Sequence, residues 1–254
     1  MPSTATALST LPLASGTSTS WEPVDAQGRV HRADYRYGRS GVATCSTVGL
    51  GDGRLVLVSP PGGADTDALY TALDGLGEVA AIVAPNAYHR VGLPVAAARY
   101  PQARIYAPPT AVKRVGERAP REVRPLDALA PSLPPEVEIF TPPHMKSQDT
   151  MVRVQTPEGV IWTQHDLILN MTVVSSHPIE RWLLGLLGYK TGLRVNRFGA
   201  KLGLLKDPPA FASWWTAELQ RTPPVAVVPG HGPVLRDAEP LARIPALIDE
   251  LGRL

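Results

Sequence analysis

Residues 225–233 read VAVVPGHGP, an apolar run that leads into one histidine held between glycines and prolines. A short apolar run bounded by turn-forming residues is typical of a strand that is buried on both faces. In α/β folds, ligands and catalytic groups lie where such strands end. The stretch therefore predicts an α/β fold with His231 at the edge that carries the chemistry.

Three other expected strands also end in histidine or aspartate. The side chains are His89 after residues 79–84, His144 after residues 136–140, and His165 and Asp166 after residues 160–163. Imidazole and carboxylate are the ligands that zinc and iron use when no thiolate is available. The four strand ends together predict a metal site built from histidine and carboxylate.

The remaining pattern alternates strands and helices around these four positions. A Gly-Asp-Gly turn at 51–53 predicts a hairpin of residues 42–50 and 54–58, and a Pro-Glu-Gly turn at 157–159 predicts a second one of residues 151–155 and 160–163. Another strand is expected at 104–107, and helices are expected at 65–76, 93–100, 110–117, 208–221 and 238–251. The order favours a sandwich of sheets covered by helices on the outside.

Composition excludes several classes of protein. The chain has 254 residues with a single cysteine, which excludes a disulfide framework and a cysteine-rich zinc module. A net charge of +2 gives no electrostatic case for nucleic acid, and no apolar run is long enough for a transmembrane helix. We expect a soluble, cytoplasmic protein.

The domain organisation is expected to be simple. Residues 1–20 carry no charge and ten Ser or Thr, which predicts a disordered tail rather than a secretory signal, and residues 21–254 are expected to form a single domain. Residues 181–206 hold six basic residues and no acidic one, together with many leucines. This basic, apolar insertion, at about 178–207, is a lid over an anionic or apolar substrate, a partner or membrane-surface contact, or an ordinary helical excursion.

The sequence around the four strand ends resembles the metallo-β-lactamase superfamily over roughly residues 40–240. Pro229-Gly230-His231-Gly232-Pro233 is similar to the element of its last metal-binding histidine, and Thr141-Pro142-Pro143-His144 to its Thr-Pro-Gly-His element. Residues 159–166 look like the strand that carries the bridging aspartate, which makes Asp166 the ligand; a shifted register would give that role to His165. The resemblance implies a four-layer αββα sandwich.

The main signature of that superfamily, His-x-His-x-Asp-His, is depleted here. Aligning its last histidine with His89 puts Ala84, Asn86 and Tyr88 in place of the two earlier histidines and the aspartate. A dinuclear centre is therefore not expected. The resemblance implies one metal held by His89, Asp166 and His231, with His144 or Tyr88 as a fourth ligand. Residues 82–89, 100–103 and 166–170 look like an uncharacterised, motif-depleted branch of the superfamily, known mainly as a domain of unknown function.

The activity implied is hydrolysis of an ester, lactone, amide or related small molecule by a metal-activated water. Asn86, Tyr88 and His165 are the candidates for a base or an oxyanion donor. Zinc is the expected metal and iron the alternative, and the partners considered are the small-molecule substrate and a second copy of the chain. Two other functions stay open: a metal-free, catalytically degenerate protein with a binding or scaffolding role, and a mononuclear iron redox enzyme.

Overall fold

A computed structural model of the protein describes residues 18–38, 41–63, 66–175 and 177–254. The strands are β1 (Glu22–Pro23), β2 (Val30–Tyr37), β3 (Gly41–Gly49), β4 (Arg54–Val58), β5 (Glu78–Val83), β6 (Arg104–Ala107), β7 (Val123–Pro125), β8 (Val137–Phe140), β9 (Met151–Thr156), β10 (Gly159–Gln164), β11 (Ile168–Met171), β12 (Gly192–Val195) and β13 (Pro224–Pro229). The helices are α1 (Asp67–Asp74), α2 (Leu93–Arg99), α3 (Val112–Gly116), α4 (Pro178–Leu186), α5 (Arg197–Gly199), α6 (Pro208–Arg221), α7 (Ala238–Ala242) and α8 (Ile244–Gly252). Single 3₁₀ turns and one π turn, Ala200–Leu204, connect some of them.

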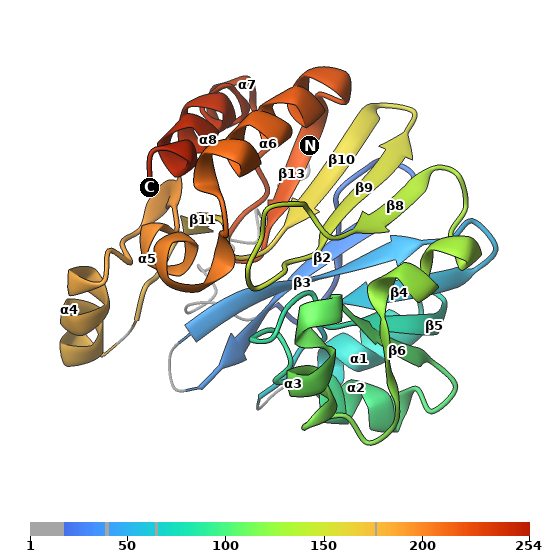
Figure 1. The fold of residues 1–254 in the computed structure, drawn as a ribbon. Helices are drawn as coiled ribbons and strands as arrows, with labels where there is room; N and C mark the ends of the chain where they lie inside the picture. Colours follow the sequence, from blue (N-terminus) through green and yellow to red (C-terminus); the bar gives the residue numbers. More distant parts are fainter. Residues whose placement is uncertain (1–17, 39–40, 64–65, 176) are drawn as a thin grey trace, which may run out of the picture.

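Two main sheets lie face to face, and helices cover their outer faces (Figure 1). The seven-stranded sheet runs in the order β1 to β7, and the four-stranded sheet in the order β13-β10-β9-β8. β4, β5, β6 and β7 are parallel to one another, and so are β10 and β13. β11 and β12 form a separate antiparallel pair. The four-layer αββα sandwich is confirmed.

The core is divided into three apolar layers because both faces of each main sheet are covered. β10 shows the division: Ile161 packs between the two sheets, whereas the next residue, Trp162, packs against the outer helices. β4 does the same, with Leu57 toward α1 and α2 and Val58 toward the other sheet. Strands buried on both faces read as continuous apolar runs, which is why the sequence marks them well.

Most expected elements are present, and the differences have local causes. The expected helix 238–251 is two helices, α7 and α8, because Pro245 has no N–H to donate to the turn before it. β2 was not expected because VHRADYRY mixes charged and apolar residues. Its Arg32 is nevertheless buried, since Asp34 and Glu22 both pair with it.

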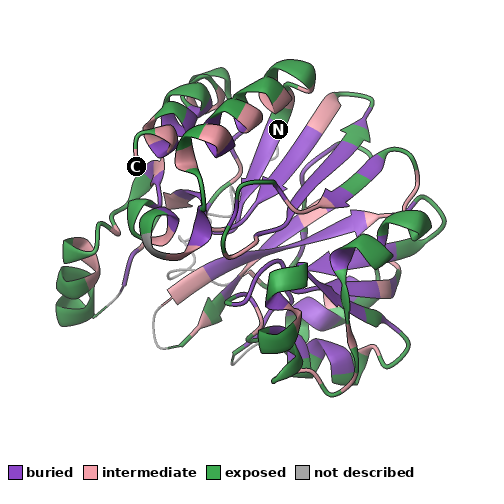
Figure 2. Ribbon diagram, viewed as in Figure 1, coloured by how far each residue is buried: buried purple, intermediate pink, exposed green. Residues whose placement is uncertain are grey.

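Part of the basic insertion packs into the rest of the fold, and part of it does not. β12 pairs with β11, and Leu193, Ala200 and Leu204 are buried in the core layer of α6 and α8. Helix α4 differs, because none of its residues is buried and it stands away from the helical layers (Figures 1 and 2). The part of the insertion that projects from the fold is therefore α4.

The structure describes only the last part of the expected N-terminal tail. Of the expected tail, residues 1–17 lie outside the described residues, while Ser18 exchanges two hydrogen bonds with Asp34 in β2. Among the described residues, no helix has the length and apolar character that crossing a bilayer requires.

Candidate metal centre

Three loops bring His89, Asp166 and His231 together at the edge where parallel strands end. His89 follows β5 of the larger sheet, while Asp166 and His231 follow the neighbouring strands β10 and β13 of the smaller one. One potential ligand atom from each of the three lies within 4.8 Å of the others. The three expected ligands, distant in the sequence, thus form one group.

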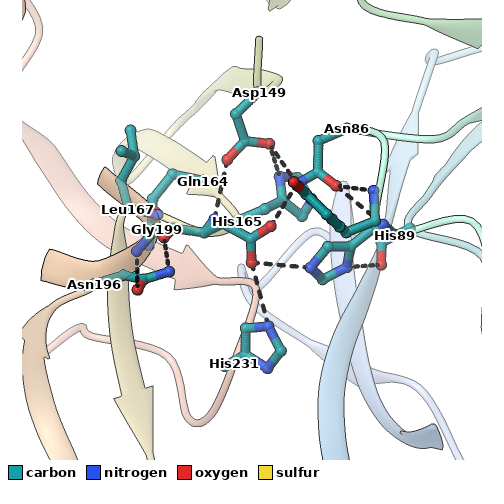
Figure 3. Close-up of polar contacts among 12 residues, drawn as sticks. Asn86, His89, Asp149, Gln164, His165, Leu167, Asn196, Gly199 and His231 are labelled. Carbon is teal, nitrogen blue, oxygen red and sulfur yellow. Dashed lines mark hydrogen bonds and ion pairs between the residues drawn. The ribbon is translucent and has the colours of Figure 1, made fainter. Parts of the chain in front are cut away.

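Asp166 lies between the two histidines. Its Oδ1 is 3.2 Å from His89 Nε2 and 3.4 Å from His231 Nε2 (Figure 3). Burial alone would raise the pKa of Asp166, but the two imidazoles hold it well below its usual range. Burial lowers the pKa of His231, and the hydrogen bond and charge of Asp166 outweigh this, so the net shift is upward. The group as a whole favours a positive charge at its centre.

Each histidine is oriented by a partner on its other ring nitrogen. His231 Nδ1 lies 2.7 Å from the carbonyl oxygen of Val42, which only accepts, so Nδ1 carries a proton. His89 Nδ1 lies 2.9 Å from Ser59 Oγ, and Ser59 Oγ is 3.2 Å from the Tyr35 hydroxyl. Such partners on the outer nitrogen fix the ring and leave Nε2 free to bind a metal.

Asn86 links two carboxylates beneath the group. Its Oδ1 accepts from the backbone N–H groups of Tyr88 and His89, which fixes the direction of the amide. Its Nδ2 then donates to Asp166 Oδ2 at 2.7 Å and to Asp149 Oδ1 at 3.2 Å. Asn86 is fully buried and does not line the cavity, so its role is to position Asp166 rather than to contact a substrate.

Asp149 was not among the expected site residues. Its Oδ2 accepts from the backbone N–H of Asp166 at 3.0 Å. Burial, followed by the charge of Asp166, raises the pKa of Asp149 to about 7. The signal was present in the expected hairpin: β9 and β10 pair Val152 with Thr163, and the same register continued by three residues sets Asp149 opposite Asp166.

Three other expected residues lie outside the group. His165 is buried, with Nδ1 3.1 Å from the carbonyl of Thr150, and burial followed by the charge of His89 lowers its pKa to about 3, so it stays neutral. It does not line the cavity, whereas Tyr88 does and is 56% exposed. His144 is exposed, while its backbone carbonyl accepts hydrogen bonds from the N–H groups of Lys206 and Asp207. Among the described histidines, cysteines and carboxylates, only His89, Asp166 and His231 form the group, so His144 is not part of it.

Two glycines allow the loop of His231 to pass this close to its neighbours. A side chain at Gly232 would begin 1.7 Å from the carbonyl oxygen of Asn170, and its φ of +100° is in the region that favours glycine. A side chain at Gly230 would begin 2.7 Å from His165 Cα. The Pro-Gly-His-Gly-Pro sequence is therefore a requirement of the packing that holds His231 next to Asp166.

The group forms the floor of a cavity of about 530 Å³. Its walls are mainly apolar and aromatic: Tyr35, Tyr37, Ala43, Tyr88, Val91, Leu169, Met171, Val174, Leu184, Leu187, Tyr189, Phe198 and Leu204. Burial raises the pKa of Tyr37 to about 12 and also raises that of Tyr189, so both hydroxyls stay protonated near neutral pH. This size and lining suit a small molecule with an apolar part.

The residues present fit a metal ion. Two imidazole Nε2 atoms and one carboxylate oxygen converge, all three side chains line the cavity, and the opposite ring nitrogens already have partners. Two histidines and one carboxylate are a ligand set of zinc and of ferrous iron that leaves coordination positions open. The polar neighbours of Asp166 on its other side are Asn86 and Asp149, and neither supplies an imidazole. The ligands present therefore suit one metal ion rather than two.

Comparison with known proteins gives the fold its name. No protein-family model matches the sequence, and no curated protein sequence matches it. Among solved structures, TMB-1 is similar with a TM-score of 0.58 and 16% identity, over 93% of this chain and 98% of that one. The metallo-β-lactamase from Pontibacter korlensis gives 0.57 and 14% over 91% and 99%, and FIM-1 from Pseudomonas aeruginosa, in its mono-zinc form, gives 0.56 and 18% over 92% and 96%. This chain has the metallo-β-lactamase fold.

Proposed function

We propose that the protein is a metal-dependent hydrolase that holds one divalent metal ion, zinc in the first instance, through His89, Asp166 and His231. The observation that carries the proposal is the convergence of three ligand atoms within 4.8 Å on the floor of a cavity of about 530 Å³. The likeness to the mono-zinc form of FIM-1 is one of fold only, but it agrees with a single-metal site. We also assign the chain to the motif-depleted branch, on the strength of Ala84, Asn86 and Tyr88.

His89, Asp166 and His231 would hold the metal, which would supply Lewis acidity toward a substrate carbonyl and a bound water. The protein orients the ligands: Ser59 and Val42 hold the two imidazoles, and Asn86 holds the outer oxygen of Asp166. Tyr37 and Tyr189, both protonated, can donate a hydrogen bond to a substrate oxygen in the cavity. His165 and Asp149 support the floor from behind it.

The substrate class follows from the cavity walls. A molecule that reaches the metal site must lie against leucine, valine and tyrosine side chains, with few charged groups to neutralise. We infer a neutral ester, lactone or amide whose acyl part is apolar, rather than an anionic one. Desolvation of the apolar acyl part then supplies much of the binding free energy.

Metal content and activity, measured together, test the proposal. Protein reconstituted with zinc and freed of excess metal should hold about one equivalent, and His231→Ala no more than about 0.2 equivalents. Hydrolysis of a series of acyl esters and lactones of increasing chain length should rise with length in the wild type and be lost in His231→Ala. Wild-type protein that retains no transition metal would instead support a binding role, and near-stoichiometric iron with oxygen uptake would support redox chemistry.

A further inference from the structure

Helix α4 is exposed or half-buried along its whole length (Figure 2). Trp182 is 64% exposed and Leu186 67%, and Ile179 and Leu183 are exposed as well. Positions 179, 182, 183 and 186 recur at the helical spacing i, i+3, i+4, i+7, so the four side chains share one face of the helix. A nine-residue helix is marginal in water, and one with an uncovered apolar face needs a partner.

The exposed face is continuous with the mouth of the cavity. Leu184 and Leu187 line the cavity from the α4 segment, and the exposed Tyr88 and Val91, in the loop after β5, and Phe198, in α5, line it as well. Among the described residues, eight of the eleven large exposed apolar side chains belong to residues 179–187 or line the cavity. Apolar exposure is thus gathered around one opening rather than scattered over the surface.

The same segment is strongly basic. Residues 181–206 carry six basic residues and no acidic one, although the whole chain carries only +2. Arg181, Lys190, Lys201 and Lys206 are exposed, while Arg197 pairs with Glu250. Glu180 in the first turn of α4 accepts a hydrogen bond from Ser175 Oγ, so α4 itself carries one acidic and one basic side chain, Glu180 and Arg181. The cationic character of the segment therefore comes from Arg181 and from the basic residues that follow α4 in the chain, beginning with Lys190.

We propose that α4 docks the protein on an anionic lipid bilayer, with Trp182 and its apolar neighbours at the level of the headgroups and the mouth of the cavity facing the membrane. A short helix with one apolar face, a tryptophan and flanking basic residues is the sequence type that lies in the interface of a bilayer. The basic residues supply attraction to anionic headgroups, and the apolar face supplies insertion. The proposal goes beyond hydrolysis and does not depend on it.

A second copy of the chain fits this surface less well. A symmetric dimer built on α4 would bring the exposed Arg181 and Lys190 of one copy toward the same residues of the other. Such juxtaposition of like charges opposes association, whereas an anionic bilayer is complementary to the same residues. The charge therefore selects lipid over self-association.

The experiment is sedimentation of the full chain with lipid vesicles, with and without bound zinc. We expect binding to vesicles of phosphatidylcholine containing about one third phosphatidylglycerol, and much weaker binding to phosphatidylcholine alone. Raising the ionic strength from about 0.05 to 0.5 M should weaken binding, because the basic residues are exposed and screened by salt. Tryptophan emission should shift to the blue on binding, and Trp182→Phe should keep binding but lose most of the shift.

Paired variants separate insertion from attraction. Trp182→Ser combined with Leu186→Ser should abolish binding, and the protein should still fold because neither side chain is buried. The matched control is Leu76→Ser combined with Val95→Ser, two exposed apolar residues elsewhere on the surface, which should bind as the wild type does. Arg181→Gln and Lys190→Gln should each weaken binding to anionic vesicles about fivefold at low salt.

Three results would overturn the proposal. The first is wild-type protein that binds anionic vesicles no better than neutral ones. The second is equal binding by the α4 pair and its control. The third is a stable dimer, by light scattering, that the α4 substitutions dissociate while vesicles bind neither form. Vesicle binding is measured without turnover. Each of these outcomes can therefore be interpreted even if the protein proves not to be a hydrolase.

Discussion

The side-chain amide of Asn86 donates to Asp166 through Nδ2, 2.7 Å from Oδ2, and the same nitrogen lies 3.2 Å from Asp149 Oδ1. Two buried carboxylates this close to each other would repel if no hydrogen-bond donor lay between them. The two N–H groups of the amide supply that donor. They also occupy the outer oxygen of Asp166 and leave Oδ1 to the histidines. Asp166 Oδ2 and Asp149 are thus satisfied by hydrogen bonds, while Asp166 Oδ1 faces the two histidines.

The first prediction follows from this bridge. Asn86→Ala should lower the free energy of unfolding by about 2–4 kcal/mol, because it leaves buried carboxylate oxygens and two backbone N–H groups without partners. Urea denaturation of the metal-free proteins measures the loss. Asn170→Ala removes an exposed hydrogen bond to Pro233 and should cost under about 1 kcal/mol. Equal losses in the two variants would contradict a special role for Asn86.

The second prediction concerns the ring of His89. Ser59→Ala removes the partner of Nδ1 and should weaken zinc binding about 10- to 100-fold, the usual effect of losing such a partner. Competition with a chelator of known affinity measures the dissociation constant. Tyr35→Phe keeps Ser59 in place and removes only the hydroxyl behind it, so it should have a smaller effect. Unchanged affinity in Ser59→Ala would show that His89 needs no orientation from Ser59.

The sequence alone predicted the parts of the fold whose signal is local. Val56, Val58 and Val83 lie in continuous apolar strands because both faces of the sheets are buried, and such runs are visible without the structure. The sequence did not predict β2, because its buried Arg32 is stabilised by Asp34 and by Glu22 of the neighbouring strand β1. A charge that is buried only because of a tertiary partner looks exposed in the sequence.

The site residues also divide into those with a local sequence signal and those without one. The sequence pointed to His89, Asp166 and His231 because each lies in the loop after an apolar strand, and His89 and His231 also lie among glycine and proline. Asp149 was not, because it has no motif of its own and reaches the site through the β9–β10 register. His144 matched a motif, but its side chain is exposed, and no local pattern in the sequence reveals this.

The third prediction is that zinc stabilises the protein through three side chains only. At free zinc about 100 times the dissociation constant, binding should add ~2.7 kcal/mol to the free energy of unfolding. For a chain of this length, Tm should rise by about 5–10 °C. His144→Asn should keep the full rise, and Asp166→Asn should lose it; asparagine is chosen at 144 because it tolerates the φ of +60° there. Loss of the rise in His144→Asn would make His144 a ligand.

The fourth prediction is a pH dependence that arises away from the metal site. Burial lowers the pKa of His31 in β2, and the charge of Asp25 offsets this only in part. Protonation therefore favours the unfolded chain, so the contribution of His31 to stability is full above the unfolded pKa of about 6.5 and declines as the pH falls below it. His31→Gln, which stays neutral, should lose less stability than the wild type between pH 7.5 and 5.5, measured as urea midpoints with zinc chelated throughout. Since the metal ligands titrate in both proteins alike, the difference between the two slopes isolates His31, and parallel slopes would exclude its contribution.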